Sequence, residues 1–242
     1  MEIDASKTVG DIVAETPATA RVFERLRIDY CCHGRQSLSA ACAAKGLSPE
    51  AVLRELGGVA ATAAPSDTRW TDRPMTELVA HLVATHHAFT VSELERGRVL
   101  GAKVVAAHKA EHPEVVAVMR TFEALREELL PHLQKEEVIL FPYVRAIEGT
   151  GPAHGCFASV AMPIRVMDME HDTAGRLLET LREQTGDYAL PADACPTWRA
   201  FWDSLQALEA DLHTHIHLES NVLFPRAVAA ESAMRATQTV RH

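Results

Sequence analysis

The sequence lacks an excess of positive charge and a long apolar run. Its 242 residues carry a formal charge of −9, which argues against nucleic acid or an anionic membrane as the main partner. No apolar run is long enough to cross a bilayer, and the first residues lack the basic segment and apolar core of a signal peptide. We therefore expect a protein that works without nucleic acid and without a membrane.

The cysteines lack the pattern of a secreted protein, and aromatic residues are scarce. The five cysteines are an odd number without framework spacing, which favours a reducing cytoplasm over a disulfide scaffold. Apolar residues make up 47% of the chain but aromatic residues only 5%, so we expect a core of Leu, Val and Ala. Few stretches alternate with a period of two, which predicts almost no sheet.

What the sequence does contain is helical periodicity in distinct zones. We predict a small helical N-terminal domain over residues 1–57, a linker of small and polar residues over 58–74, a bundle over 75–231 and a tail over 232–242. Gly and Pro clusters divide the bundle into four helices, at about 75–107, 114–147, 163–185 and 196–231. An antiparallel four-helix bundle is the usual arrangement of such helices, so the predicted fold class is all-α.

One eleven-residue pattern occurs twice in the bundle. The two copies are His132-Leu-Gln-Lys-Glu136-Glu-Val-Ile-Leu-Phe-Pro142 and His215-Ile-His-Leu-Glu219-Ser-Asn-Val-Leu-Phe-Pro225. A His and a Glu four residues apart lie one turn apart on the same helix face. Imidazole and carboxylate that point the same way suit iron, manganese or zinc. The repeat therefore predicts a metal site in an internally duplicated helical bundle.

Helical projection places both residues of the second copy on the buried face. The apolar stripe of the fourth helix comprises Leu205, Leu208, Leu212, Ile216 and Leu223. His215 and Glu219 fall inside this stripe, whereas His213 and His217, which are also four apart, project from its flank. A buried Glu is costly unless its charge is compensated, as a metal would do. We therefore assign His213 and His217 to solvent or to a supporting role around the ligands.

The second and third helices give a similar result. The inner face of the second helix comprises Phe122, Leu125, Leu129, Ile139 and Tyr143. His132 and Glu136 lie among these residues, and Glu137 turns toward the edge. In the third helix, His171 shares a face with Ile164, Met167, Ala174 and Leu178. Glu170 lies to one side, where it is a candidate to support a ligand or to line a proton path.

The first helix carries two adjacent candidates, His86 and His87, and periodicity does not decide between them. With one of them, the four helices supply four imidazoles and two carboxylates. Two metal ions that share two bridging carboxylates would each receive two His and both Glu. Iron is the most natural occupant of such mixed ligation in a bundle core, and open positions remain for an oxo bridge or a small ligand.

These motifs resemble those of the RIC family (repair of iron centres, the YtfE/ScdA type), which are di-iron proteins with a hemerythrin-like bundle. The N-terminal segments Thr8 to Phe23 and Asp29-Tyr-Cys-Cys-His-Gly34 look like the small cysteine-bearing domain of that family. The segment Met169-Glu-His-Asp-x-Ala-Gly175 and both copies of the repeat match its metal motifs. The resemblance covers nearly the whole chain.

The resemblance implies two iron ions with an oxo bridge, held by His87, His132, Glu136, His171, His215 and Glu219. The choice of His87 rests on its spacing to His108, which matches the family, and His86 replaces a common aromatic residue and stays the alternative. The two Glu residues would bridge the irons. The implied role is the repair of iron–sulfur clusters damaged by nitrosative or oxidative stress, by supply of iron. Damaged iron–sulfur proteins would then be the partners, with nitric oxide or oxygen as small ligands and a homodimer as an option.

Cys31 and Cys32 are candidate thiols for redox or transfer chemistry. Adjacent cysteines form at best a strained disulfide, and the nearby His33 and Arg35 favour the thiolate form. Ordinary thiols at a helix end are the other interpretation. The remaining cysteines, Cys42, Cys156 and Cys195, show no ligand spacing, so we expect them to be inert.

Two other functions stay open at this point. The reduced metal centre would couple two nitric oxide molecules to nitrous oxide in one alternative, and Glu170 would then lie on the proton route. In the other, the bundle is a hemerythrin-like module that binds or senses oxygen or nitric oxide. Incidental metal affinity of a helical protein is the remaining interpretation.

Overall fold

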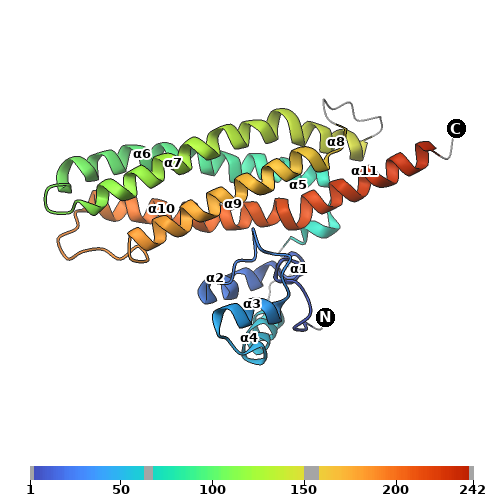
Figure 1. The fold of residues 1–242 in the computed structure, drawn as a ribbon, viewed down its shortest axis with the longest axis horizontal. Helices are drawn as coiled ribbons and strands as arrows, with labels where there is room; N and C mark the ends of the chain where they lie inside the picture. Colours follow the sequence, from blue (N-terminus) through green and yellow to red (C-terminus); the bar gives the residue numbers. More distant parts are fainter. Residues whose placement is uncertain (1–2, 63–67, 150–157, 240–242) are drawn as a thin grey trace. The chain divides into compact units, whose positions relative to one another are not determined.

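The computed structural model describes residues 3–62, 68–149 and 158–239. Within these ranges the chain is helical, and an isolated antiparallel bridge between Thr8 and Ser37 is the only β-pairing there. None of the described helices is both long and apolar enough to cross a membrane. The predicted fold class is confirmed: the protein is an all-α bundle preceded by a small helical domain (Figure 1).

The bundle is built from four long helical stretches, three of which are interrupted by a π-helical segment. They are α5 (Met75–His81), η3 (Leu82–His87) and α6 (Ala88–His108); α7 (Glu114–Lys135), η4 (Glu136–Leu140) and α8 (Phe141–Gly149); α9 (Ala161–Gln184); and α10 (Pro196–His217), η5 (Leu218–Leu223) and α11 (Phe224–Thr239). These bounds agree with the predicted helices to within two residues, except that the fourth stretch ends at Thr239 rather than at residue 231. Two compact units can be separated, and the divisions fall inside α5 after Val79, inside α8 after Tyr143 and inside α10 after Leu212.

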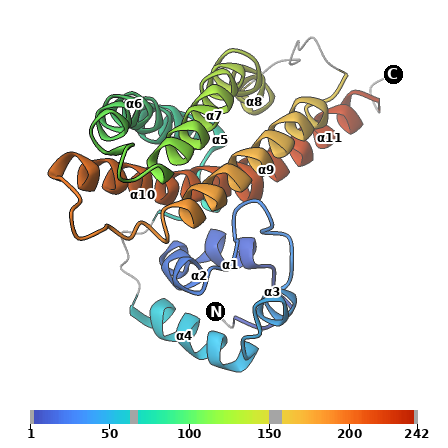
Figure 2. The ribbon, with the colours of Figure 1, turned by 60° about the vertical axis from the view of Figure 1, so that its left-hand side comes forward.

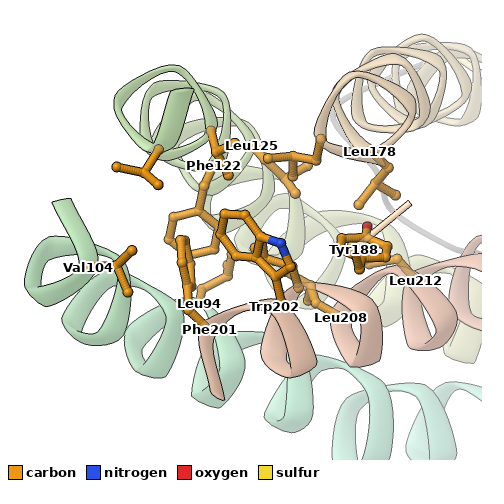
Figure 3. Packing of buried hydrophobic residues seen from close by; sticks show 14 of the residues in the cluster. Leu94, Val104, Phe122, Leu125, Leu178, Tyr188, Phe201, Trp202, Leu208 and Leu212 are labelled. Atoms are coloured by element: carbon orange, nitrogen blue, oxygen red, sulfur yellow. The ribbon is translucent and has the colours of Figure 1, made fainter. Parts of the chain in front are cut away.

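One unit contains α6, α7, α9 and the first part of α10, which run side by side (Figures 1 and 2). Its core joins aliphatic side chains to a cluster of aromatic rings around Phe122, Phe201 and Trp202 (Figure 3). The rings of Phe122 and Phe201 meet edge to face, 5.8 Å apart. Gly97 lets α6 approach α7, because a Cβ there would lie 2.7 Å from the Phe122 ring. Five of the thirteen aromatic residues of the chain belong to this core.

The other unit contains the N-terminal helices α1 (Val9–Glu15), η1 (Pro17–Thr19), α2 (Ala20–Leu26), α3 (Leu38–Lys45) and α4 (Pro49–Thr62), together with η5 and α11. The side chains of Thr8 and Ser37 cap α1 and α3 by accepting backbone N–H groups. The buried core of these helices comprises Val9, Ile12, Val13, Val22, Phe23, Ile28, Tyr30, Leu38, Ala41, Cys42, Val52 and Leu56.

The N-terminal helices contact η5 through Asn221. Its side-chain amide donates to the backbone carbonyls of Tyr30 at 3.2 Å and Cys31 at 2.9 Å. A Cβ added at Gly10 or Gly34 would come within 2.6 Å and 2.3 Å of the Asn221 side chain. Only glycine therefore leaves room for this side chain at both positions.

Two helices extend beyond the predicted zone boundaries. Helix α4 continues to Thr62, into the segment that we predicted to be a linker. Gly57 and Gly58 lower the helix propensity of this segment but do not end the helix. Val59 still packs against the N-terminal core, which favours continuation of the helix. Residues 63–67 of the predicted linker lie outside the described residues. Helix α11 likewise runs to Thr239, through most of the predicted tail.

The π-helical segments η4 and η5 follow from the Leu-Phe-Pro end of each repeat. Pro142 and Pro225 lack the N–H that would continue an α-helix, and the proline ring crowds the carbonyl four residues earlier. In each copy a wider turn closes just before the proline, with Phe141 N–H bonded to the Glu136 carbonyl and Phe224 N–H bonded to the Glu219 carbonyl. The repeat thus carries the same backbone irregularity at the same place.

This irregularity explains one wrong prediction about the inner face. We assigned Ile139 to the buried stripe, but its side chain is 42% exposed. Projection at 100° per residue assumes an unbroken α-helix, and the π-helical turn inserts an extra residue between Glu136 and Leu140. Leu140 and Phe141 are buried in its place.

Candidate metal centre

Three helical stretches of the bundle bring imidazole nitrogens to one buried carboxylate. His132 at the end of α7 places Nε2 3.4 Å from Oε1 of Glu136, and His87 in η3 places Nε2 3.5 Å from Oε2 of the same carboxylate. His171 in α9 directs its Nε2 toward Nε2 of His132, 3.2 Å away. All four side chains are at most 3% exposed. The Nε2 atoms of the three histidines therefore point into one polar interior.

Two of these histidines each have a further carboxylate behind the ring, which fixes the orientation of the imidazole. Nδ1 of His132 is 2.9 Å from Glu170, and Nδ1 of His87 is 2.8 Å from Glu137. A carboxylate at Nδ1 keeps the proton on that nitrogen and leaves Nε2 as the donor to a metal. The sequence singled out Glu170 for such a role, but it placed Glu137 at the edge and missed its contact with His87.

Glu170 is also held by Lys135, whose ammonium group forms an ion pair with it. Burial opposes the negative charge of Glu170, but the hydrogen bonds from Lys135 and His132 outweigh this effect and hold its pKa below the usual value. Glu170 is therefore ionised at neutral pH, as a partner of a polarised imidazole should be.

The second repeat copy supplies a matching pair. His215 near the end of α10 and Glu219 in η5 place Nε2 and Oε1 3.2 Å apart. Both residues are at most 1% exposed. As in the first copy, the Glu lies in the π-helical segment and the His one turn before it.

The candidate ligand atoms form two overlapping groups, in each of which the atoms lie within 4.8 Å of one another. One group comprises His87, Glu136, His215 and Glu219, and the other comprises His132, Glu136, His171 and Glu219. Glu136 and Glu219 belong to both groups, and each group adds two histidines. Every residue in them is buried.

The donor set fits metal ions better than it fits a hydrogen-bonded core. Both carboxylate oxygens of Glu136 are buried and accept no hydrogen bond from the described residues, which is costly for an ionised group. Two donors about 2.1 Å from one ion would be about 3.0–3.4 Å apart at octahedral or tetrahedral angles. The observed separations between Nε2 and carboxylate oxygens, 3.2–3.5 Å, lie close to this range.

The structure separates the two histidines between which periodicity could not decide. His86 is buried as well, but its Nδ1 is 2.9 Å from Asp211, and it belongs to neither group. His87 belongs to the first group. The geometry therefore favours His87 over His86 as the ligand from the first helix.

His217 does not face solvent, which was one of the two positions that we predicted for it from the sequence. It is 3% exposed and packs edge to face against the Tyr30 ring, 5.5 Å away, and its Nδ1 is 3.3 Å from the Asn221 amide. Burial lowers the pKa of His217 to about 4. The residue is a neutral contact between the N-terminal helices and the end of α10.

The cysteines fall into different environments. Cys31 is buried and Cys32 is half-buried, and both lie outside the two His/Glu groups and form no disulfide. The hydrogen bond to Cys32 and burial raise the pKa of Cys31, so the expectation that its thiolate is favoured was wrong. Cys195, which we expected to be inert, directly precedes α10, and its sulfur lies 3.2 Å from Nε2 of His108 at the end of α6. This hydrogen bond and the backbone N–H of Trp198 lower the pKa of Cys195. Cys156 lies outside the described residues.

Comparisons with known proteins agree with this arrangement. Residues 5–60 match the model of the ScdA_N domain, described as a domain of unknown function (DUF542), and residues 78–227 match the hemerythrin HHE cation binding domain. The chain is 37% identical over 225 residues to the iron-sulfur cluster repair protein YtfE of Escherichia coli O157:H7, which covers 92% of this chain and 97% of that protein. The protein of the same name from Enterobacter sp. (strain 638) is 38% identical over 226 residues, with the same coverage.

Proposed function

This chain belongs to the family of YtfE-type iron–sulfur cluster repair proteins and contains a hemerythrin HHE cation binding domain, and from this premise we propose that it is a di-iron protein that supplies iron for the repair of damaged iron–sulfur clusters. The damage in question is nitrosative or oxidative, and the partners are iron–sulfur proteins that have lost iron. The comparisons support the repair role, and the chemistry of the site supports the iron.

The observation that carries the proposal is the sharing of Glu136 and Glu219 between the two ligand groups. In this assignment His87 and His215 bind one iron, and His132 and His171 bind the other. The two carboxylates bridge them and leave room for an oxo bridge. The six donors fall into two groups of four rather than one group around a single point, so two ions give each donor a role.

The donor types suit an iron that must be released. Four neutral imidazoles and two carboxylates hold ferrous iron with borderline and hard ligands, which bind it less tightly than thiolates do. Iron held there would supply an exchangeable ferrous ion to a cluster that lacks one. The roles of Glu137 and Glu170 are to keep the proton on Nδ1 of His87 and His132.

The proposed domain organisation follows the predicted zones. The N-terminal domain over residues 1–57 presents Cys31 and Cys32 as transfer thiols, the segment 58–74 connects it to the bundle, and the bundle over 75–231 holds the iron. The family matches over residues 5–60 and 78–227 support this division.

The test is the reactivation of an iron–sulfur enzyme that nitric oxide or peroxide has inactivated. Protein loaded with ferrous iron under argon should restore activity, and Glu136→Ala should abolish the effect because it removes a bridge. Glu95→Ala is the matched control, since Glu95 is an exposed carboxylate that forms an ion pair with Arg98 on the same helix.

Two results would contradict the proposal. One is failure of the loaded protein where an equal amount of a ferrous salt succeeds. The other is equal reactivation by wild type and Glu136→Ala. Gas analysis in the same reaction vessel, with nitric oxide as the damaging agent, separates the alternative: release of nitrous oxide without reactivation would favour nitric oxide reduction over iron supply.

A further inference from the structure

A separate cluster of metal-binding side chains lies in the N-terminal helical domain. Asp29, Cys31 and Cys32 each place one donor atom within 4.8 Å of the other two. None of these residues belongs to the His/Glu groups. The cluster sits on the turn between α2 and α3, where Arg27 ends α2 in the left-handed conformation.

The two thiols have the spacing that a metal requires and a disulfide does not. Their sulfur atoms are 3.8 Å apart. Two metal–sulfur bonds of about 2.3 Å that meet at the tetrahedral angle place the sulfurs about 3.8 Å apart, whereas a disulfide holds them about 2.0 Å apart. Adjacent cysteines reach this spacing only when the backbone between them turns, so the turn has already set the distance.

Asp29 holds that turn in place. Its Oδ1 accepts the backbone N–H of Cys31 at 2.9 Å and that of Cys32 at 3.0 Å, and it also accepts from the Cys31 thiol at 3.2 Å. Its Oδ2 is 2.6 Å from Nδ1 of His33. The carboxylate is thus fixed against both thiols, and a bound cation would take the position that the Cys31 proton now holds between sulfur and oxygen.

We propose that Asp29, Cys31 and Cys32 form a second metal site, which takes one thiophilic divalent cation of the ferrous or zinc class. Two sulfurs and one carboxylate suit such an ion, and they do not suit calcium or magnesium. Binding replaces the two thiol protons, so two sulfur–hydrogen bonds break, two metal–sulfur bonds form and the protons pass to solvent.

The site is built for exchange rather than for permanent structure. Three protein donors leave one tetrahedral position open, whereas structural zinc sites are closed by four. Cys32 is half-buried and the neighbouring His33 is exposed, so solvent reaches one side of the cluster. This assignment does not depend on the repair role or on the iron content of the bundle.

The test is a titration of the full-length, reduced protein with Co²⁺ under argon. Only sulfur ligation produces an intense thiolate-to-cobalt charge-transfer band, so occupation of the His/Glu groups does not contribute to the signal. We expect one equivalent of thiolate-bound cobalt, displaced by Zn²⁺ in excess of the amount that fills the His/Glu groups. Cys32→Ser should abolish the band, and Asp29→Asn should weaken binding about tenfold or more.

Cys42→Ser and Cys195→Ser are the matched controls. Cys42 is a buried thiol of the same domain, and Cys195 is the thiol beside His108. Both variants should keep the full band. Loss of the band in Cys195→Ser, its persistence in Cys32→Ser, or its absence from the wild type at excess Co²⁺ would each overturn the proposal.

A second measurement uses the wild type alone and so does not depend on how the variants fold. Zn²⁺ should protect Cys31 and Cys32 from alkylation, as read by peptide mass spectrometry, and leave the alkylation of Cys195 unchanged. Equal alkylation of Cys32 without Zn²⁺ and with Zn²⁺ in excess of the amount that fills the His/Glu groups would contradict the site.

Discussion

Replacement of Glu136 by Gln should have opposite effects on the metal-free and the metal-loaded protein. The Glu136 side chain is fully buried, and its oxygens accept no hydrogen bond from the described residues. Without metal, its charge is held only by imidazole nitrogens at 3.4 Å and 3.5 Å. An amide of the same shape removes the charge and offers an N–H donor to one of those two nitrogens, which face opposite ends of the side chain.

The magnitude follows from the cost of an unsatisfied buried group. That cost is about 1–3 kcal/mol, so Glu136→Gln should stabilise the metal-free protein by up to this amount. For a chain of this size, 1 kcal/mol corresponds to about 2–4 °C in Tm. In the wild type, metal at a thousandfold excess over its Kd adds about 4 kcal/mol, and the variant should lose most of this gain.

The assay is thermal unfolding with and without ferrous iron under argon, and Glu209→Gln is the matched control. Glu209 is an equally buried carboxylate of the bundle, but it accepts hydrogen bonds from Arg182 at 2.9 Å and 2.6 Å and from Tyr188 at 2.7 Å. Its replacement should destabilise both forms equally. The reasoning is refuted if Glu136→Gln lowers the Tm of the metal-free protein as Glu209→Gln does. It is also refuted if iron raises the Tm of Glu136→Gln as much as it raises that of the wild type.

Three further predictions test the surroundings of the site. Glu137→Gln removes the acceptor at Nδ1 of His87 and should weaken metal binding about 10–100-fold in a competitive chelator titration; unchanged affinity would contradict the supporting role. The pKa of His217 is about 4 in the folded protein and about 6.5 when unfolded, so the unfolded chain binds the proton first as the pH falls. Metal-free wild type should therefore lose about 3 kcal/mol relative to His217→Gln between pH 6.5 and 4 in urea unfolding, and parallel pH profiles would refute this. Because its pKa is lowered, Cys195 should react with iodoacetamide at neutral pH faster than a free thiol peptide, and His108→Ala should slow it; an equal rate in the variant would count against the pair.

Periodicity was enough to predict the long helices and the buried face that carries the repeat. The stripe from Leu205 to Leu223 is buried throughout, because an apolar face with a 3.6-residue period has few other ways to leave water. His215 and Glu219 were placed on that face by the same projection. A buried His and Glu in an apolar stripe, found twice, was the signal that pointed to metal.

Periodicity failed where the backbone departs from the α-helix. The π-helical segment η3 contains both His86 and His87, and both side chains are buried, so no angular rule could choose between them. The choice depended on the partners, Asp211 for one and Glu136 with Glu137 for the other. The exposure of Ile139 has the same origin in η4.

Side-chain contacts between residues far apart in the sequence could not be predicted from the periodicity of single helices. His217 is buried because Tyr30, almost two hundred positions earlier in the chain, covers it. His108 and Cys195 meet although neither lies in a recognisable motif. Such pairs depend on how the helices are placed in space, and one sequence carries no record of that placement.

Metal analysis with Mössbauer spectroscopy of protein purified without oxygen tests the central claim most directly. The sharing of Glu136 and Glu219 between the ligand groups predicts two irons per bundle that are magnetically coupled. Glu219→Ala should reduce the iron content and remove the coupling. One uncoupled iron per chain, or zinc in place of iron, would contradict the account.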